Sequence, residues 1–217
     1  MRIFLDTADT TLIEKYFLSG LVDGVTTNPT LIMKSGRNPE DVYQTIKDLG
    51  VKDISMEVVG DTSAMLEEGF RLHDKFGDVC TVKVPCSPDG LYACKTLSEN
   101  CIKVNVTLIF DAAQAILAAK AGARYVSPFV GRVYDQHWDG LSLIEEIADV
   151  FATHQITETE VLAASIREAN QVSKAFKVGA DICTLPWGVF NKMYNHILTD
   201  KGLELFDADW KALQEKL

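Results

Sequence analysis

The feature that most constrains this chain is a regular alternation of short apolar runs with longer helical patterns. The apolar runs are rich in Val, Ile and Ala, which is typical of strands buried on both faces. They occupy the segments 2–6, 22–28, 53–59, 80–85, 102–110, 123–130, 161–165 and 180–186. Helical patterns follow over 10–18, 39–50, 62–77, 90–99, 111–122, 142–153, 167–179 and 187–198. Such alternation, with about 27 residues for each unit, predicts parallel strands joined by helical crossovers.

Eight strand–helix units predict an α/β protein whose residues 1–217 form a single-domain (β/α)8 TIM barrel. The main alternative is an open doubly wound sheet, whose dinucleotide-binding members carry a Gly-rich turn after the first strand. The corresponding stretch here, "LDTADTTLIE", contains no glycine, and this favours the barrel. An extra polar helix is expected over about 201–216. Because a barrel closes without it, this helix is available to pack on a neighbouring subunit.

Composition excludes several classes of partner. The formal net charge of −10 leaves no basic face for a nucleic-acid backbone. Five cysteines with no CxxC pair support neither a disulfide framework nor a zinc site, and they suit a reducing cytoplasm. No segment approaches the roughly 18 apolar residues of a membrane helix. The start "MRIFLDTAD" lacks the regions of a signal peptide, so we expect a cytoplasmic protein with no membrane or nucleic-acid partner.

Strand parity sorts residues into those that face the helices and those that face the barrel interior. Val82 and Val84 belong to the apolar set of their strand, which places Lys83 inside. In the next strand Val104, Val106 and Leu108 are expected to face the helices, so the residues between them face inward. The same reasoning brings a set of polar residues to the inner strand ends: Asp6, Asn28, Glu57, Asn105, Thr107, Ser127 and Ser165. Barrel enzymes place their chemistry at this C-terminal end.

A lysine on a strand more often faces solvent, but the acids, amides and hydroxyls of the same inner parity favour an interior Lys83. Desolvation favours the neutral amine, which is the nucleophilic form. Such an amine attacks a carbonyl carbon to give a Schiff base, and the iminium then accepts electrons from a breaking carbon–carbon bond. Asp6 and Glu57 are the available proton carriers, and Thr107 is placed to hold a water. This chemistry needs no cofactor and no metal, and the four histidines fall in helices or loops, where surface positions are more typical than ligand positions.

Two arginines lie just after late strands, where barrels commonly bind phosphate. Arg132 stands in "SPFVGRVYD", and Arg167 stands in "AASIREA" beside Ser165. Planar guanidinium groups bind phosphate well, so a phosphorylated ligand is favoured. The alternative is that both arginines form surface salt bridges in an acidic protein.

Seven motifs in order resemble the transaldolase family over nearly the whole chain: "LDTAD", "GVTTNPTLI", "EVVG", "VKVP", "NVTLIFDAAQ", "SPFVGR" and "AASIR". The length is similar to the small-subunit branch, which contains both transaldolases and fructose-6-phosphate aldolases. The resemblance implies a homo-oligomer, typically a decamer in which C-terminal helices pack across subunits.

The resemblance also implies roles for individual residues. Lys83 would form the Schiff base, and Asp6 would accept and return the proton of the substrate hydroxyl. Glu57 and Thr107 would hold the catalytic water. Asn28, Asn105 and Ser127 would bind the dihydroxyacetone part, and Arg132, Ser165 and Arg167 would hold the phosphate. The implied reaction moves a dihydroxyacetone unit from a ketose phosphate, such as sedoheptulose 7-phosphate or fructose 6-phosphate, to an aldose phosphate in the pentose phosphate pathway.

Two positions separate the branches of the family. The aldolase type has glutamine where this chain has Glu57 and tyrosine where it has Phe129, so both residues favour the transferase. The alternative is an aldolase that releases free dihydroxyacetone. A non-catalytic phosphosugar-binding barrel would have no use for Lys83 facing two acids. A deoxyribose-phosphate type of aldolase is disfavoured because its lysine would come from a later strand.

Overall fold

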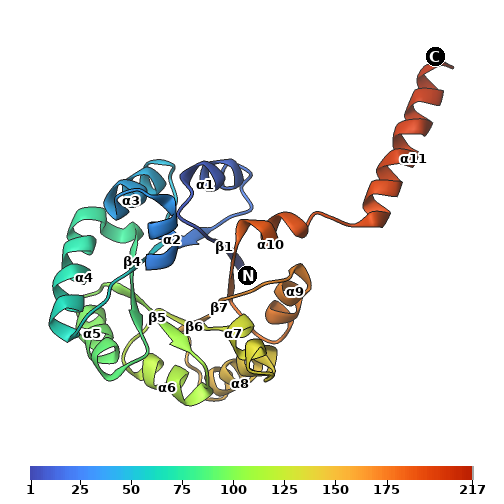
Figure 1. The fold of residues 1–217 in the computed structure, drawn as a ribbon. Helices are drawn as coiled ribbons and strands as arrows, with labels where there is room; N and C mark the ends of the chain where they lie inside the picture. The colour runs from blue at the N-terminus through green and yellow to red at the C-terminus, as the bar shows by residue number, and fades with distance from the viewer. Residues whose placement is uncertain (217) are drawn as a thin grey trace.

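In residues 1–216, which the computed structural model describes, eight parallel strands close into a barrel (Figure 1). The strands are β1 (Arg2–Asp6), β2 (Gly24–Thr26), β3 (Ile54–Glu57), β4 (Cys80–Pro85), β5 (Lys103–Ile109), β6 (Tyr125–Pro128), β7 (Glu160–Ala163) and β8 (Ile182–Leu185). They follow one another in chain order around the barrel, and β8 pairs with β1 to close it. The predicted (β/α)8 barrel is therefore confirmed.

Helices surround the barrel, except for the C-terminal helix, which projects away from it (Figure 1). They are α1 (Thr10–Phe17), α2 (Pro29–Ser35), α3 (Pro39–Asp48), α4 (Thr62–Phe76), α5 (Pro88–Glu99), α6 (Ala112–Lys120), α7 (Val130–Asp135), α8 (Gly140–Thr153), α9 (Ala169–Lys177), α10 (Trp187–Lys192) and α11 (Ile197–Gln214), with a 3-10 turn at Gly77–Val79. Short polar side chains start most of them. Asp9, Asn28, Asn38, Asp61, Ser87, Asp111 and Asp139 each accept a hydrogen bond from a backbone N–H of the first turn.

Two short helices were not expected from the sequence. In α2, Asn28 caps the start, Pro29 is the first residue and Gly36 at φ 65° ends it. This helix buries only Ile32, so its sequence carries no helical periodicity. The other is α7, which begins at Val130 and replaces the end of the strand expected over 123–130.

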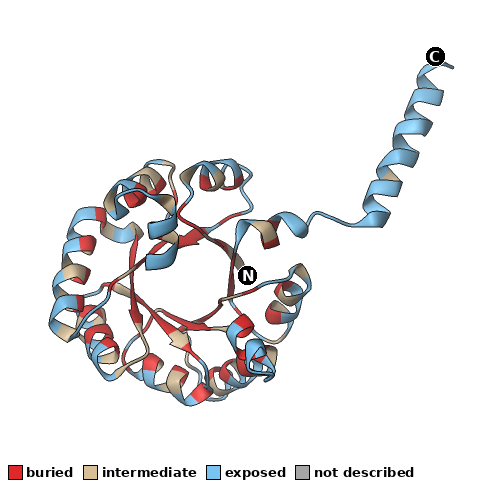
Figure 2. Ribbon diagram, viewed as in Figure 1, coloured by how far each residue is buried: buried red, intermediate tan, exposed pale blue. Residues whose placement is uncertain are grey.

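The C-terminal helices differ from the expected boundaries. The helix expected over 187–198 ends at Lys192, and α11 begins at Ile197 rather than near residue 201. The break lies at His196, whose extended backbone caps α11 through a hydrogen bond from the N–H of Leu198 to Nδ1. Figure 1 shows α11 projecting away from the barrel, and Figure 2 shows that it is exposed along its length. Among the described residues, no helix is both long enough and apolar enough to cross a membrane.

Strand parity fails at Leu108 in β5. The register between β5 and β6 shifts between Val106 and Ile109, and Leu108 has a left-handed φ of 60°. This is a β-bulge, so Ile109 takes the buried core position and Leu108 is only partly buried. The expectation that Leu108 packs towards the helices with Val104 and Val106 is therefore wrong.

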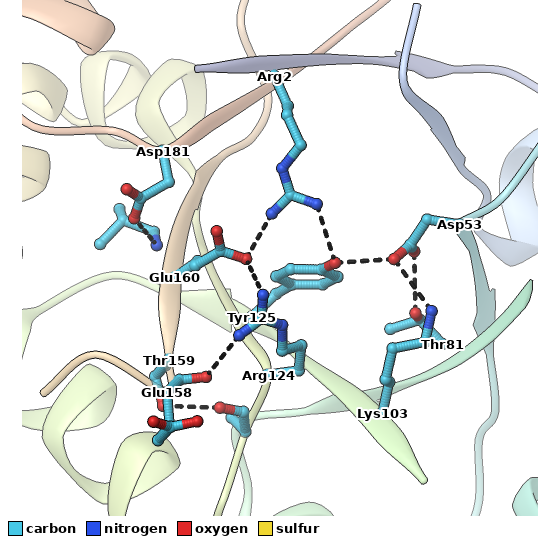
Figure 3. Close-up of polar contacts among 12 residues, drawn as sticks. Arg2, Asp53, Thr81, Lys103, Arg124, Tyr125, Glu158, Thr159, Glu160 and Asp181 are labelled. Carbon is cyan, nitrogen blue, oxygen red and sulfur yellow. Dashed lines mark hydrogen bonds and ion pairs between the residues drawn. The ribbon is translucent and has the colours of Figure 1, made fainter. Parts of the chain in front are cut away.

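The barrel interior is layered along its axis. An apolar layer inside the strands contains Phe4, Tyr125, Leu162, Ala164 and Ile182. Below it, polar groups from the N-terminal ends of the strands form a continuous network of hydrogen bonds and ion pairs, the barrel floor (Figure 3). The floor consists of Arg2, Asp53, Thr81, Lys103, Arg124, Tyr125 and Glu160. The candidate active site lies at the opposite end of the barrel, at the C-terminal ends of the strands.

Candidate active site

A cavity of about 150 Å³ opens at the C-terminal ends of the strands. Its lining residues are Asp6, Thr26, Asn28, Lys83, Asn105, Thr107, Ser127, Phe129, Arg132, Leu162, Ala164, Ser165 and Thr184. Every site residue chosen from the sequence belongs to this set except Glu57 and Arg167. Glu57 lines the adjoining part of the mouth together with Lys83 and Thr107.

Lys83 lies inside the barrel, as its parity predicts. Val82 and Val84 are fully buried on the helix side, and only 6% of Lys83 is exposed. Its Nζ atom lies 2.9 Å from Oε2 of Glu57 and donates a hydrogen bond of 3.1 Å to the backbone carbonyl of Thr27. The register explains the ion pair, because Lys83 of β4 stands opposite Glu57 at the end of β3.

Asp6 ends β1 and is partly buried at the cavity that Lys83 also lines. Its Oδ1 atom accepts a 2.8 Å hydrogen bond from Thr26, whose hydroxyl lies 2.6 Å from that of Thr184. Burial raises the pKa of Asp6, while the positive charge of Lys83 and the hydrogen bond from Thr26 act in the opposite direction. A carboxyl with a raised pKa is suited to carry a proton at a reacting centre.

Amides and hydroxyls on the neighbouring strands are fixed by each other. Ser127 donates a 2.6 Å hydrogen bond to Oδ1 of Asn105, and Asn105 donates from Nδ2 to Ser55 at 3.1 Å. This chain fixes which way the amide of Asn105 faces. Asn28 accepts the N–H of Leu31 at Oδ1, so its NH2 group is the part that a ligand would meet.

Thr107 is the exception among these groups. Its Oγ1 atom is buried, and no residue in the described chain hydrogen-bonds to it. Buried hydroxyls are normally satisfied, so this atom marks a place where a water or a ligand hydroxyl would be bound.

The two arginines are brought close by backbone pairing that continues beyond the strands. Val130 donates to the carbonyl of Ala164 at 3.0 Å, and Gly131 donates to that of Ser165 at 3.1 Å. A Cβ at Gly131 would lie 2.2 Å from this second carbonyl, so the approach requires glycine. Ser165 itself has a left-handed φ of 58°, a strained conformation of the kind found at functional sites.

Arg132 and Arg167 make different contacts. Arg132 lines the cavity, and its guanidinium lies 5.0 Å from the ring centroid of Phe129. Arg167 does not line the cavity, because both ends of its guanidinium bind the carboxylate of Asp135. This contact lowers the pKa of Asp135.

Four further residues line the cavity that are not expected from the sequence: Thr26, Leu162, Ala164 and Thr184. Thr26 and Thr184 are the polar members, and both belong to the hydrogen-bonded chain that reaches Asp6. The inward parity of Thr184 in "ICTLP" was the available signal for it.

Comparison with known proteins places the chain in a family. Residues 3–217 match the Transaldolase/Fructose-6-phosphate aldolase family. A probable transaldolase of Nitrosopumilus maritimus (strain SCM1) is 50% identical over 215 residues, which cover 99% of this chain and 96% of the relative. A probable transaldolase of Paracoccus denitrificans (strain Pd 1222) is 49% identical over 218 residues and is covered completely, as is this chain.

Among solved structures, the thiamine phosphate pyrophosphorylase of Pyrococcus furiosus superposes with a TM-score of 0.58 at 14% identity, and 85% of each chain is covered. This likeness concerns the barrel fold alone. The full-length sequence matches carry the assignment: the chain belongs to the Transaldolase/Fructose-6-phosphate aldolase family.

Proposed function

We propose that this protein is a transaldolase that transfers a dihydroxyacetone unit between sugar phosphates through a Schiff base on Lys83. The observation that carries the proposal is the buried amine of Lys83, held 2.9 Å from Glu57 at a polar cavity that Asp6 also lines. The full-length likeness to relatives named probable transaldolases supports the same reaction. The substrates would be a ketose phosphate donor and an aldose phosphate acceptor of the pentose phosphate pathway.

We expect the side chains at the cavity to serve each step of this reaction. Glu57 takes a proton from the ammonium of Lys83, and the neutral amine attacks C2 of the ketose. Loss of water gives the iminium. Asp6 then takes the proton of the C4 hydroxyl while the C3–C4 bond breaks, and the bonding electrons move towards the iminium to leave an enamine. The aldose phosphate departs, an acceptor aldehyde reverses the steps with Asp6 returning its proton, and water hydrolyses the imine.

Thr107 supports this scheme, because its unpartnered hydroxyl lines the mouth with Lys83 and Glu57. A water held there would serve imine formation and hydrolysis. Asn28, Asn105 and Ser127 would bind the hydroxyls of the dihydroxyacetone part. Their mutual hydrogen bonds hold the latter two in fixed orientations, which favours binding without reorganisation.

The phosphate would bind between Arg132, Ser165 and Arg167. Because Asp135 occupies the guanidinium of Arg167, a phosphate would replace this carboxylate as the bidentate partner. Arg132 already lines the cavity and would meet the same anion from α7.

We also infer a homo-oligomer, which the family resemblance suggests is a decamer. Leu203, Phe206, Trp210 and Leu213 recur every three or four residues on α11, and all four are exposed. An apolar stripe on a projecting helix is suited to bind a second copy of the chain, and light scattering of the full chain measures this. The five free thiols suit a reducing compartment, so we place the enzyme in the cytoplasm.

Borohydride trapping tests the mechanism. With fructose 6-phosphate present, reduction should attach a three-carbon fragment to Lys83, and peptide mass spectrometry locates it. Lys83→Met should lose both labelling and activity. Lys103→Met is the matched control, because this lysine also points into the barrel but at the floor, where it pairs with Asp53. An unlabelled Lys83 in active protein would rule out the mechanism.

A product assay tests the choice between transferase and aldolase. A transaldolase should consume fructose 6-phosphate only when an aldehyde acceptor is added and should form a new ketose phosphate. Accumulation of free dihydroxyacetone without an acceptor would instead identify the aldolase.

A further inference from the structure

We propose that Thr184 is a positioning residue for Asp6 and that it acts through the hydroxyl of Thr26. The inference rests on the proposed function, in which Asp6 takes up and returns a proton. The three side chains come from adjacent strands, because closure of the barrel puts β1 between β2 and β8. Thr26 and Thr184 are both almost fully buried, at 2% and 3% exposed.

Hydrogen-bond accounting fixes the direction of this chain. Thr26 donates its single hydroxyl hydrogen to Oδ1 of Asp6 across 2.8 Å. Its 2.6 Å contact with Thr184 must then be one in which Thr184 donates and Thr26 accepts. With Asp6 ionised, Thr184 therefore donates to Thr26, and Thr26 donates to the carboxylate.

Protonation of Asp6 reverses the direction without moving a heavy atom. The carboxylic acid donates to Thr26, and the hydroxyl of Thr26 turns to donate to Thr184. Both protonation states keep two hydrogen bonds among these three side chains, and in the protonated state the hydroxyl hydrogen of Thr184 is directed to the cavity that this residue lines. A carboxyl that must hold a proton in one half of a reaction and release it in the other benefits from such a chain.

The charged groups that face Asp6 are Lys83 on β4, which favours its ionised form, and Glu57 on β3, which disfavours it. The two strands that flank β1 contribute the neutral hydroxyls of Thr26 and Thr184. Removing the hydroxyl of Thr184 consequently changes no charge near the carboxyl, and any change in the titration of Asp6 comes from the hydrogen-bonded chain itself.

Thr184→Val keeps the shape of the side chain and removes its hydroxyl. In this variant a protonated Asp6 would leave the hydroxyl hydrogen of Thr26 without an acceptor, which forfeits a whole hydrogen bond. Loss of cooperative polarisation in the ionised state weakens one bond by only about 10–30%. The protonated form is therefore disfavoured more than the ionised form. The acidic limb of kcat/KM should move to lower pH, and kcat should fall roughly 3- to 10-fold with KM within about twofold.

Thr184→Ser is the matched control, because it keeps the hydroxyl and removes only a methyl group. The proposal expects the serine variant to keep the pH profile and kcat of the parent. An unshifted acidic limb in Thr184→Val, or equal losses in both variants, would overturn it and leave Thr184 with a packing role.

A readout that does not depend on turnover separates this proposal from the proposed function. Infrared difference spectra follow the protonated carboxyl band of Asp6, which is identified by its loss in Asp6→Asn. In Thr184→Val this band should disappear at lower pH than in the parent. If the band shifts but borohydride labels no lysine, the positioning role stands and the transaldolase proposal fails. If labelling succeeds and the band does not shift, the reverse holds.

Discussion

The coupling between Lys83 and Glu57 should be far stronger than that of an exposed ion pair with the same separation. A double-mutant cycle with Lys83→Met, Glu57→Gln and the double variant isolates the coupling. At 2.9 Å and an effective dielectric constant of about 20, the attraction is about 6 kcal/mol before desolvation is subtracted. Breaking a buried pair by removing one partner costs about 3–5 kcal/mol. Because 16% of the Glu57 side chain is exposed and keeps contact with water, we expect a coupling near the lower end, about 3 kcal/mol.

The chain offers a closely matched control in Lys95 and Glu99 on α5. Their N–O distance is also 2.9 Å, but their side chains are 56% and 60% exposed. Exposed pairs one helical turn apart contribute about 0.3–0.5 kcal/mol. The same cycle at these positions should therefore give a coupling several times smaller. High salt should weaken the coupling between Lys95 and Glu99 further but leave that between Lys83 and Glu57 unchanged.

Urea unfolding of all variants at one protein concentration and at pH 7 supplies the free energies of unfolding. Equal couplings in the two cycles would refute the reasoning, because they would mean that burial does not strengthen the pair. A coupling between Lys83 and Glu57 below about 1 kcal/mol would do the same.

Two further predictions concern charge at the site. Burial raises the pKa of Asp6, so folding disfavours the ionised carboxylate, which the unfolded chain keeps in water at neutral pH. Asp6→Asn should therefore be inactive, but its free energy of unfolding in urea should exceed that of the parent at pH 7. This difference should vanish as the pH falls to about 4, where the unfolded carboxyl becomes protonated. A difference that does not change with pH would contradict this prediction. Asp135→Asn should release Arg167 and strengthen inhibition by inorganic phosphate by roughly two- to fivefold, with an unchanged inhibition constant as the opposing result.

Local patterns in the sequence were sufficient to predict the barrel and much of its mouth. Val82, Lys83 and Val84 are a clear case, because strand parity depends only on the backbone and on which face is apolar. Parity failed at Leu108, where a bulge inserts one residue into the alternation. No residue in "NVTLIF" signals this bulge, since it depends on how β5 pairs with β6.

Features that depend on long-range contacts were beyond the sequence. The pairing of Arg167 with Asp135 requires α7, a helix of six residues that is too short to show a period. The chain from Thr184 to Asp6 requires that the first and last strands meet. Both relations join residues 32 or more positions apart, and neither leaves a local trace.

Parity places Lys103 inside the barrel as firmly as it places Lys83, so an interior amine is not enough to identify the reactive one. The two lysines differ in the surroundings of the carboxylates with which they pair. At the floor, Asp53 accepts from Thr81 at 2.9 Å, Tyr125 at 2.7 Å and Lys103 at 3.2 Å (Figure 3). These three donors occupy both oxygens of the Asp53 carboxylate and fix it in place.

At the mouth, the carboxylate of Glu57 meets Lys83, and both line a space open to a ligand. In the proposed mechanism, this acid takes the proton of the amine, and the amine then attacks a carbonyl carbon. Under this proposal, a lysine–carboxylate pair is structural at the floor of the barrel and reactive at its mouth. The role of an inward lysine therefore depends on whether it lies near the N-terminal or the C-terminal end of its strand, and parity alone does not give this position.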